Sequence, residues 1–210
     1  VFVFCKDQAS DEAAGPNTSV FVQGGTVGAG EPFGGSTPSG SETPVIPETP
    51  TAPVGPAAGS LVKLECGPDA GADDPCTAVY YVGKDGARHA FPNSKVYFSW
   101  YTDFNSVQTI TPDVLGGLPL GKNVTYRPGY KLVKFITDPK TYVVAKGAQL
   151  EWVTTEDVAI GLYGTDWNTK VEDIPDTFFG DYTLGNNISD AANYNVTSEL
   201  NSAPTIDDNF

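Results

Sequence analysis

An internal repeat is the feature of this chain of 210 residues that most restricts how it can fold. The tripeptide Leu61-Val62-Lys63 returns as Leu132-Val133-Lys134, and from Tyr80 onward the matched residues lie 61 to 64 positions apart. A repeat at a nearly fixed offset indicates a tandem duplication and predicts two halves with the same order of elements. The matched pairs are Tyr80/Tyr142, Val82/Val144, Lys84/Lys146, Gly86/Gly147, Ala87/Ala148, Phe91/Trp152, Thr102/Thr165, Asp103/Asp166, Phe104/Trp167, Val107/Val171, Ile110/Ile174, Pro112/Pro175, Asp113/Asp176, Leu120/Leu184 and Gly121/Gly185.

Each half is predicted to contain a strand, a hairpin and short helices. Asp85-Gly86 separates two apolar runs, which is a good signal for a β-hairpin. Asn93 and Thr155 each precede an apolar segment and can cap a helix. Pro112 and Pro175 suit the first positions of two further helices. The second half lacks the insertion that runs from Cys66 to Cys76 in the first.

The predicted fold is therefore α+β and β-rich, with two pseudo-symmetric tandem units at about 61–121 and 132–185. Another hairpin is expected to join them, with strands over 123–127 and 131–137 and Pro128-Gly129 at the turn.

Composition divides the rest of the chain. Residues 1–34 hold two short runs of β-branched and aromatic residues that read as isolated strands, and residues 35–60 are rich in Pro, Gly, Ser and Thr. Residues 186–210 are polar and show no strong periodicity. The expected organisation is an N-terminal strand-bearing arm (1–34), a linker (35–60), a duplicated domain (61–185) and a polar C-terminal tail (186–210).

The formal net charge is −14, and the isoelectric point is about 4.2. Such an acidic chain repels phosphate backbones and anionic lipid, so nucleic acid and membrane surfaces are not expected partners. No apolar run approaches the roughly 18 residues that a membrane-spanning helix needs, so no transmembrane segment is expected.

Several strings in residues 61–210 carry a resemblance to known sequences. They are Val79-Tyr80-Tyr81, Phe91-Pro92-Asn93, Trp100-Tyr101-Thr102-Asp103-Phe104, Pro119-Leu120-Gly121-Lys122-Asn123-Val124-Thr125-Tyr126-Arg127-Pro128-Gly129, Thr137-Asp138-Pro139-Lys140 and Leu162-Tyr163-Gly164. They resemble a tandem repeat domain of uncharacterised exported or cell-surface proteins of candidate-phylum bacteria. The resemblance implies an extracellular or cell-surface location. It brings no catalytic residue and no activity.

In that setting, Cys66 and Cys76 are predicted to form a disulfide around a short loop, the alternative being two free buried thiols. The remaining cysteine, Cys5, is open to pairing between subunits, burial as a thiol or lipid attachment. Within the same loop, Asp69, Asp73 and Asp74 could hold calcium, but their spacing matches no calcium-loop motif. A solvated acidic turn is the favoured interpretation, and no cofactor or metal is expected.

No catalytic residue is predicted, and the chain is not expected to be an enzyme. His89 is the only histidine, and its match with Leu150 in the second half indicates a packing position. Trp100, Trp152 and Trp167 could form a platform for sugar, but two of the three recur at matched aromatic positions, which favours a core role.

Four sequons make the chain a candidate glycoprotein, at Asn17, Asn123, Asn187 and Asn195.

The sequence favours a structural subunit of an extracellular, pilus-like fibril. A lone strand must pair with a sheet edge, and the N-terminal strands could add to a neighbouring copy as donor strands, which makes a homopolymer. The alternative is a cell-surface module that binds cell-wall glycan or another surface polymer, with residues 1–60 as a stalk. The predicted subunit-contact residues are Val1, Phe2, Val3, Phe4, Val20, Phe21 and Val22.

Overall fold

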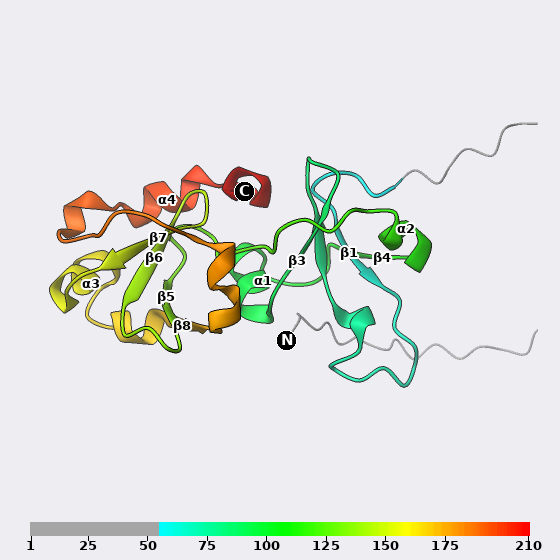
Figure 1. Ribbon diagram of the computed structural model, residues 1–210, viewed down its shortest axis with the longest axis horizontal. Coiled ribbons are helices and arrows are strands. Elements are labelled where there is room, and N and C mark those ends of the chain that lie inside the picture. Colours follow the sequence, from blue (N-terminus) through cyan, green and yellow to red (C-terminus); the bar gives the residue numbers. More distant parts are fainter. Residues whose placement is uncertain (1–54) are drawn as a thin grey trace, which may run out of the picture. The chain divides into compact units, whose positions relative to one another are not determined.

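The computed structural model describes residues 55–210 (Figure 1). The predicted N-terminal strands, most of the predicted linker, Cys5 and Asn17 lie outside the described residues. In the described part, two mixed β-sheets and several short helices confirm the predicted β-rich α+β fold.

The first sheet has four strands in the order β3-β2-β1-β4. Its central strand β1 pairs antiparallel with β2 and parallel with β4, and β2 and β3 form the predicted hairpin around Asp85-Gly86. Helix α2 lies beside β1 and β4 (Figure 1). The elements of this half are β1 (Leu61–Leu64), the 3₁₀ turn η1 (Pro75–Thr77), β2 (Tyr80–Val82), β3 (Arg88–Ala90), α1 (Ser94–Trp100), β4 (Val107–Ile110) and α2 (Pro112–Gly116).

The second sheet has five strands in the order β8-β5-β6-β7-β9. Its strand β5 pairs antiparallel with β6 and parallel with β8, and β9 adds in parallel to β7. Helix α4 runs alongside β6 and β7 (Figure 1). The elements are β5 (Leu132–Phe135), β6 (Thr141–Ala145), β7 (Gln149–Val153), α3 (Glu156–Tyr163), η2 (Trp167–Lys170), β8 (Val171–Ile174), η3 (Asp176–Asp181), β9 (Thr183–Leu184), η4 (Ala191–Asn193), α4 (Val196–Ser202) and η5 (Ile206–Asn209).

Side-chain caps fix where the helices begin. The Asn93 side chain accepts a hydrogen bond from the Val96 N–H at 3.0 Å and caps α1, as predicted. Thr155 does the same for α3 by accepting from the Val158 N–H at 3.3 Å. Each cap satisfies a backbone donor that the first helical turn leaves without a partner, so both helices start at residues that the sequence marks.

Two sequence predictions are wrong in detail. Residues 123–127 form no strand; the Val124 N–H donates instead to Ala90 O, and the Tyr126 N–H to the Tyr182 hydroxyl. The segment is tied in this way to β3 and to the residue that ends η3, which consumes backbone donors that a hairpin would use. Pro175 precedes the short helix η3 and does not stand at its first position.

The C-terminal segment is more ordered than its composition suggests. Residues 196–202 form α4, capped by Asn195, whose side chain accepts from the Ser198 N–H at 2.8 Å. Ile188 and Ile206 are each only 2 % exposed. Both residues therefore belong to the core, although their wide spacing in the sequence forms no periodic apolar face. Single apolar side chains anchor this segment.

The described residues belong to one compact unit, and each sheet in it buries both of its faces. Adjacent strand residues point to opposite sides, so each sheet has a helix side, where α1 or α3 packs, and an open side. The helix sides hold Leu61, Tyr81 and Tyr97 in the first half, and Leu132, Val143 and Val158 in the second. The open sides hold Val62, Val82 and Leu115 in the first, and Val133, Tyr142 and Ile174 in the second.

The largest core cluster joins unlike sides of the two sheets. It contains the helix side of the first sheet, with Leu61 and Tyr97, and the open side of the second, with Val133 and Ile174. The helix side of the second sheet and the open side of the first each belong to separate, smaller clusters. The two sheets therefore pack through unlike faces, with the helix side of the first sheet against the open side of the second.

Cys66 and Cys76 form a disulfide across the insertion, with a Cα–Cα distance of 5.2 Å. We expect reduction, or the double change Cys66→Ser and Cys76→Ser, to lower the free energy of unfolding by about 2–3 kcal/mol, as the loop-entropy model gives for a loop of this length. Urea unfolding with and without reductant measures this loss. Cys5→Ser is the matched control and should leave the unfolding midpoint unchanged. Equal midpoints for the oxidised and reduced protein would contradict the expected contribution.

Candidate functional site

His89, the only histidine in the chain, lies in a closed slot. Its side chain is 3 % exposed; Nδ1 lies 2.8 Å from Lys122 O and Nε2 lies 3.2 Å from an Asp85 carboxylate oxygen. A Cβ added at Gly121 would come within 2.4 Å of the imidazole, so backbone closes over the ring. The Phe210 ring stacks on it at 4.1 Å between centroids. These contacts occupy both ring nitrogens and leave no room for a substrate, which makes His89 a packed side chain.

The acidic loop around the disulfide does not gather its carboxylates. Asp74 accepts a hydrogen bond from the Cys76 N–H at 3.0 Å and caps the turn η1, while Asp69 and Asp73 are exposed. Among residues 55–210, no group of three or more His, Cys, Asp and Glu side chains is placed to hold a metal ion.

The sequons that fall in the described part differ in their surroundings. Asn187 and Asn195 are exposed. Asn123 is half-buried, and its amide nitrogen donates to an Asp181 carboxylate oxygen at 3.0 Å. Thr125, the third residue of that sequon, is only 5 % exposed. Glycosylation therefore stays a prediction at all three positions, with the better access at Asn187 and Asn195.

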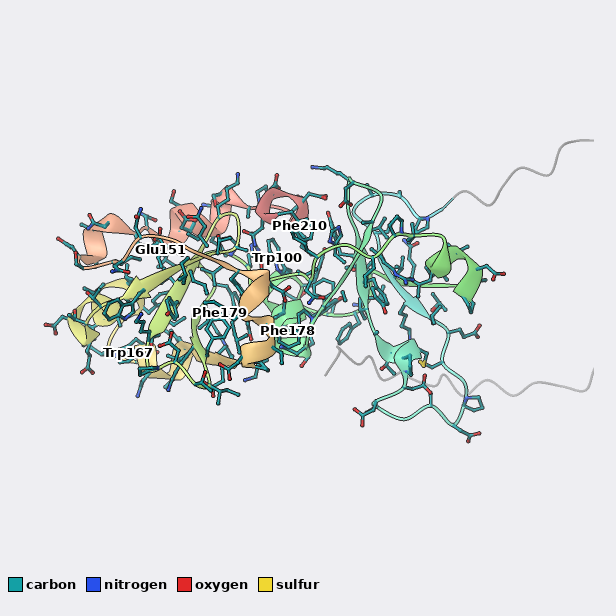
Figure 2. The ribbon with its side chains drawn as sticks, viewed as in Figure 1. Trp100, Glu151, Trp167, Phe178, Phe179 and Phe210 are labelled. Carbon is teal, nitrogen blue, oxygen red and sulfur yellow. A yellow bond between two sulfur atoms is a disulfide. The ribbon has the colours of Figure 1, made fainter. Side chains whose placement is uncertain are left out.

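A polar rim surrounds the contact between α1 and the second sheet, which we call the inter-sheet junction. The Lys95 ammonium lies 2.6 Å from one carboxylate oxygen of Glu172, and the Lys131 ammonium lies 2.7 Å from the other. Phe178 from η3 meets Val96 and Ile174 at a small gap here, and Figure 2 shows Phe178 beside α1. Ion pairs at the rim and apolar contacts inside it hold α1 against the second sheet.

These partners favour the charged form of Glu172. Burial by itself raises the pKa of this carboxyl, but hydrogen bonds from Lys131 and Lys95 and their positive charges outweigh it, so the pKa lies below its ordinary value. A carboxyl whose folded-state pKa is lowered stabilises the fold above its unfolded pKa of about 4.3, and that stabilisation is lost as the pH falls through the folded-state pKa.

We expect Glu172→Gln to lower the free energy of unfolding at pH 7 by about 1–2 kcal/mol, because it removes the negative charge and replaces one of the two oxygens that Lys95 and Lys131 contact with an NH2 group, which cannot accept a hydrogen bond. The difference from the original protein should shrink as the pH falls below about 4, where the carboxyl takes up a proton. Urea unfolding at pH 7 and at pH 3 measures both values. Asp173→Asn, at the exposed neighbouring position, is the matched control. A difference that persists unchanged at pH 3 would contradict the ionic origin.

An open cleft of about 380 Å³ lies at the N-terminal end of α3, and we call it the aromatic cleft. Trp152 and Trp167 line it together with Thr155 and Glu156. The Lys140 ammonium lies 5.0 Å from the centroid of the Trp152 ring. Both tryptophans are partly exposed, as is Phe104, the counterpart of Trp167, whereas Phe91, the counterpart of Trp152, is fully buried in the core. Aromatic faces beside convergent polar groups are typical of small-molecule and sugar sites.

A second hollow, of about 490 Å³, opens beside the outer strand of the first sheet, and we call it the β4 groove. Leu64, Gln108, Ile110 and Val114 line it from the open side of that sheet, and Glu65 and Thr109 line it as well. Sequence reasoning did not find this groove. It depends on the parallel pairing of β4 with β1, and no local pattern signals that pairing.

No helix among the described residues is long and apolar enough to cross a membrane. No protein-family model, no curated protein and no solved structure matches this chain, so the candidate surfaces rest on its own geometry.

Proposed function

We propose that the two halves are copies of one structural unit. Strand register supports this: Leu61 to Leu64 pair with Val107 to Ile110, and Leu132 to Phe135 pair with Val171 to Ile174, in each case in parallel. In both halves an antiparallel hairpin, a capped helix and a parallel edge strand follow in that order. The repeated sequence and this repeated order are the two arguments for duplication.

We propose further that the protein is a structural subunit of an extracellular filament that grows when the N-terminal strands of one copy add to the next. The observation that carries this proposal is the edge of β4. Within residues 55–210, β4 pairs with one strand only, β1, so its outer edge is open to another strand beyond Val107, whose N–H donates to Phe104 O at 3.0 Å. An exposed edge is a liability that a monomer usually protects, and a polymer uses it.

Negative-stain electron microscopy of the glycosylated full chain, with and without residues 1–34, tests the filament proposal. We expect ordered fibrils from the full chain and none from the shortened one. Phe2→Asp combined with Phe4→Asp should also abolish fibrils, because a charged strand does not pair with an apolar site. Phe33→Asp, in the same arm but outside the predicted strands, is the matched control. Monomers in every sample, with folded circular dichroism spectra, would refute the proposal.

The aromatic cleft favours a second candidate function, the recognition of a cell-wall glycan or another surface polymer. Trp152 and Trp167 line the cleft, with the Lys140 ammonium over the Trp152 ring, and Thr155 and Glu156 supply hydrogen-bonding groups beside them. Rigid aromatic anchors with a few polar neighbours concentrate binding energy in small sites.

We expect Trp167→Ala to weaken binding to purified cell-wall polysaccharide about tenfold, which corresponds to about 1.4 kcal/mol. Phe179→Ala is the control, because Phe179 is an exposed aromatic residue outside the cleft. Co-sedimentation with the insoluble polymer measures the affinities. If both variants bind equally well, the cleft is not the glycan site, whatever the outcome of the fibril experiment.

A further inference from the structure

The inter-sheet junction is a contact between two different surfaces. On one side stands the first turn of α1, where Lys95 and Val96 follow the cap residue Asn93. On the other side stands the open face of the second sheet, where Lys95 pairs with Glu172 and Val96 lies near Ile174. A contact between unlike surfaces can be repeated without limit, since each unit still has one surface of each kind to offer.

The first sheet keeps the open-side surface without a second sheet upon it. In strand register, Gln108 stands opposite Val62 as Glu172 stands opposite Val133, and Ile110 stands opposite Leu64 as Ile174 stands opposite Phe135. Gln108 and Ile110 both line the β4 groove. The β4 groove therefore lies on the first sheet at the place where α1 lies on the second sheet.

The second sheet keeps the complementary surface. Asp157 and Val158 follow the cap residue Thr155, as Lys95 and Val96 follow Asn93. The turn η4 flanks α3 near Gly161, where an added Cβ would lie 2.7 Å from Ala191. The N-terminal turn, at Thr155 to Asp157, is exposed. Val158 itself is only 6 % exposed and packs in the core of its own half, so the accessible part of the matching turn is polar, from Thr155 to Asp157.

We propose that the β4 groove of one molecule receives the N-terminal turn of α3 from a second copy of this chain, in a repetition of the inter-sheet junction. This inference rests on the proposed duplication. It adds to the filament proposal a second subunit contact, separate from the N-terminal strands. The contact does not close on itself, so it produces a linear array. It lacks the ion pair of the inter-sheet junction, because Asp157 and Gln108 stand where Lys95 and Glu172 stand inside the molecule.

Electrostatic repulsion and the small size of the groove determine the strength of this contact. The net charge of −14 repels a second copy, and salt screens that repulsion, so association through the groove should increase with ionic strength. A groove of this size gives a weak contact by itself. Tethering by an N-terminal strand would raise the effective concentration of the neighbour and make the weak contact effective.

Cysteine cross-linking in the full chain tests the proposal. In a Cys5→Ser background, a Gln108→Cys protein is mixed with an Asp157→Cys protein at 0.5 M salt under mild oxidation. These positions correspond to Glu172 and Lys95, whose side chains meet at the inter-sheet junction. We expect a covalent heterodimer on a non-reducing gel. The control pair, Gln108→Cys with Asn201→Cys on the exposed face of α4, should give none above the collision background.

Ile110→Glu in the Gln108→Cys protein should abolish the cross-link, because it places a charge in the apolar part of the groove. Val114→Glu, at the rim of the groove, serves as a second variant if the first fails to fold, as judged by circular dichroism. Repeating the experiment without residues 1–34 separates this inference from the filament proposal. Cross-links without fibrils would support the groove contact alone. Fibrils whose subunits give no Gln108–Asp157 cross-link above the control would overturn it.

Discussion

The packing of the helix side of the first sheet on the open side of the second is the constraint on which the rest of the structure depends. Tyr97, which is fully buried on α1, and Val133, which is fully buried on β5, belong to one core cluster. Neither sheet is large enough to bury both of its faces alone. The contact between the two sheets buries one face of each. The short helix α2 and the C-terminal segment cover most of the two other sheet faces.

Local sequence signals predicted the pieces well because each depends on a few neighbouring residues. Asp85-Gly86 marks a hairpin through the backbone freedom of its glycine, whose φ is +77°, and Thr155 marks a helix start through its hydroxyl. The repeat then predicted a second hairpin and a second capped helix from the first. The disulfide followed from the spacing of Cys66 and Cys76 and from the exported setting that the resemblance implied.

The arrangement of those pieces could not be read in the same way. Leu61 and Val62 are both fully buried, as are Leu132 and Val133, so alternation of apolar and polar residues does not identify which face meets the other sheet. The pairing of β1 with β4 joins residues far apart in the chain, and the Tyr81 hydroxyl donates to Asp207, 126 positions away.

The two proposed surfaces share a further property that only the structure reveals: Thr155 and Glu156 line the aromatic cleft and lie on the turn proposed to enter the β4 groove. A bound glycan and a docked second copy would therefore compete.

The C-terminal segment ties the hairpin turns of both sheets. Asp207 accepts from the Lys84 N–H at 2.8 Å in the first half, and Asn209 accepts from the Gly147 N–H at 2.9 Å in the second. Contacts between residues so distant in sequence are slow to form, because a long loop must close before they contribute any stability. The last step of folding should therefore wait until residue 209 has left the ribosome. Until then the two hairpin turns lack the side-chain acceptors that Asp207 and Asn209 provide for the Lys84 and Gly147 N–H groups.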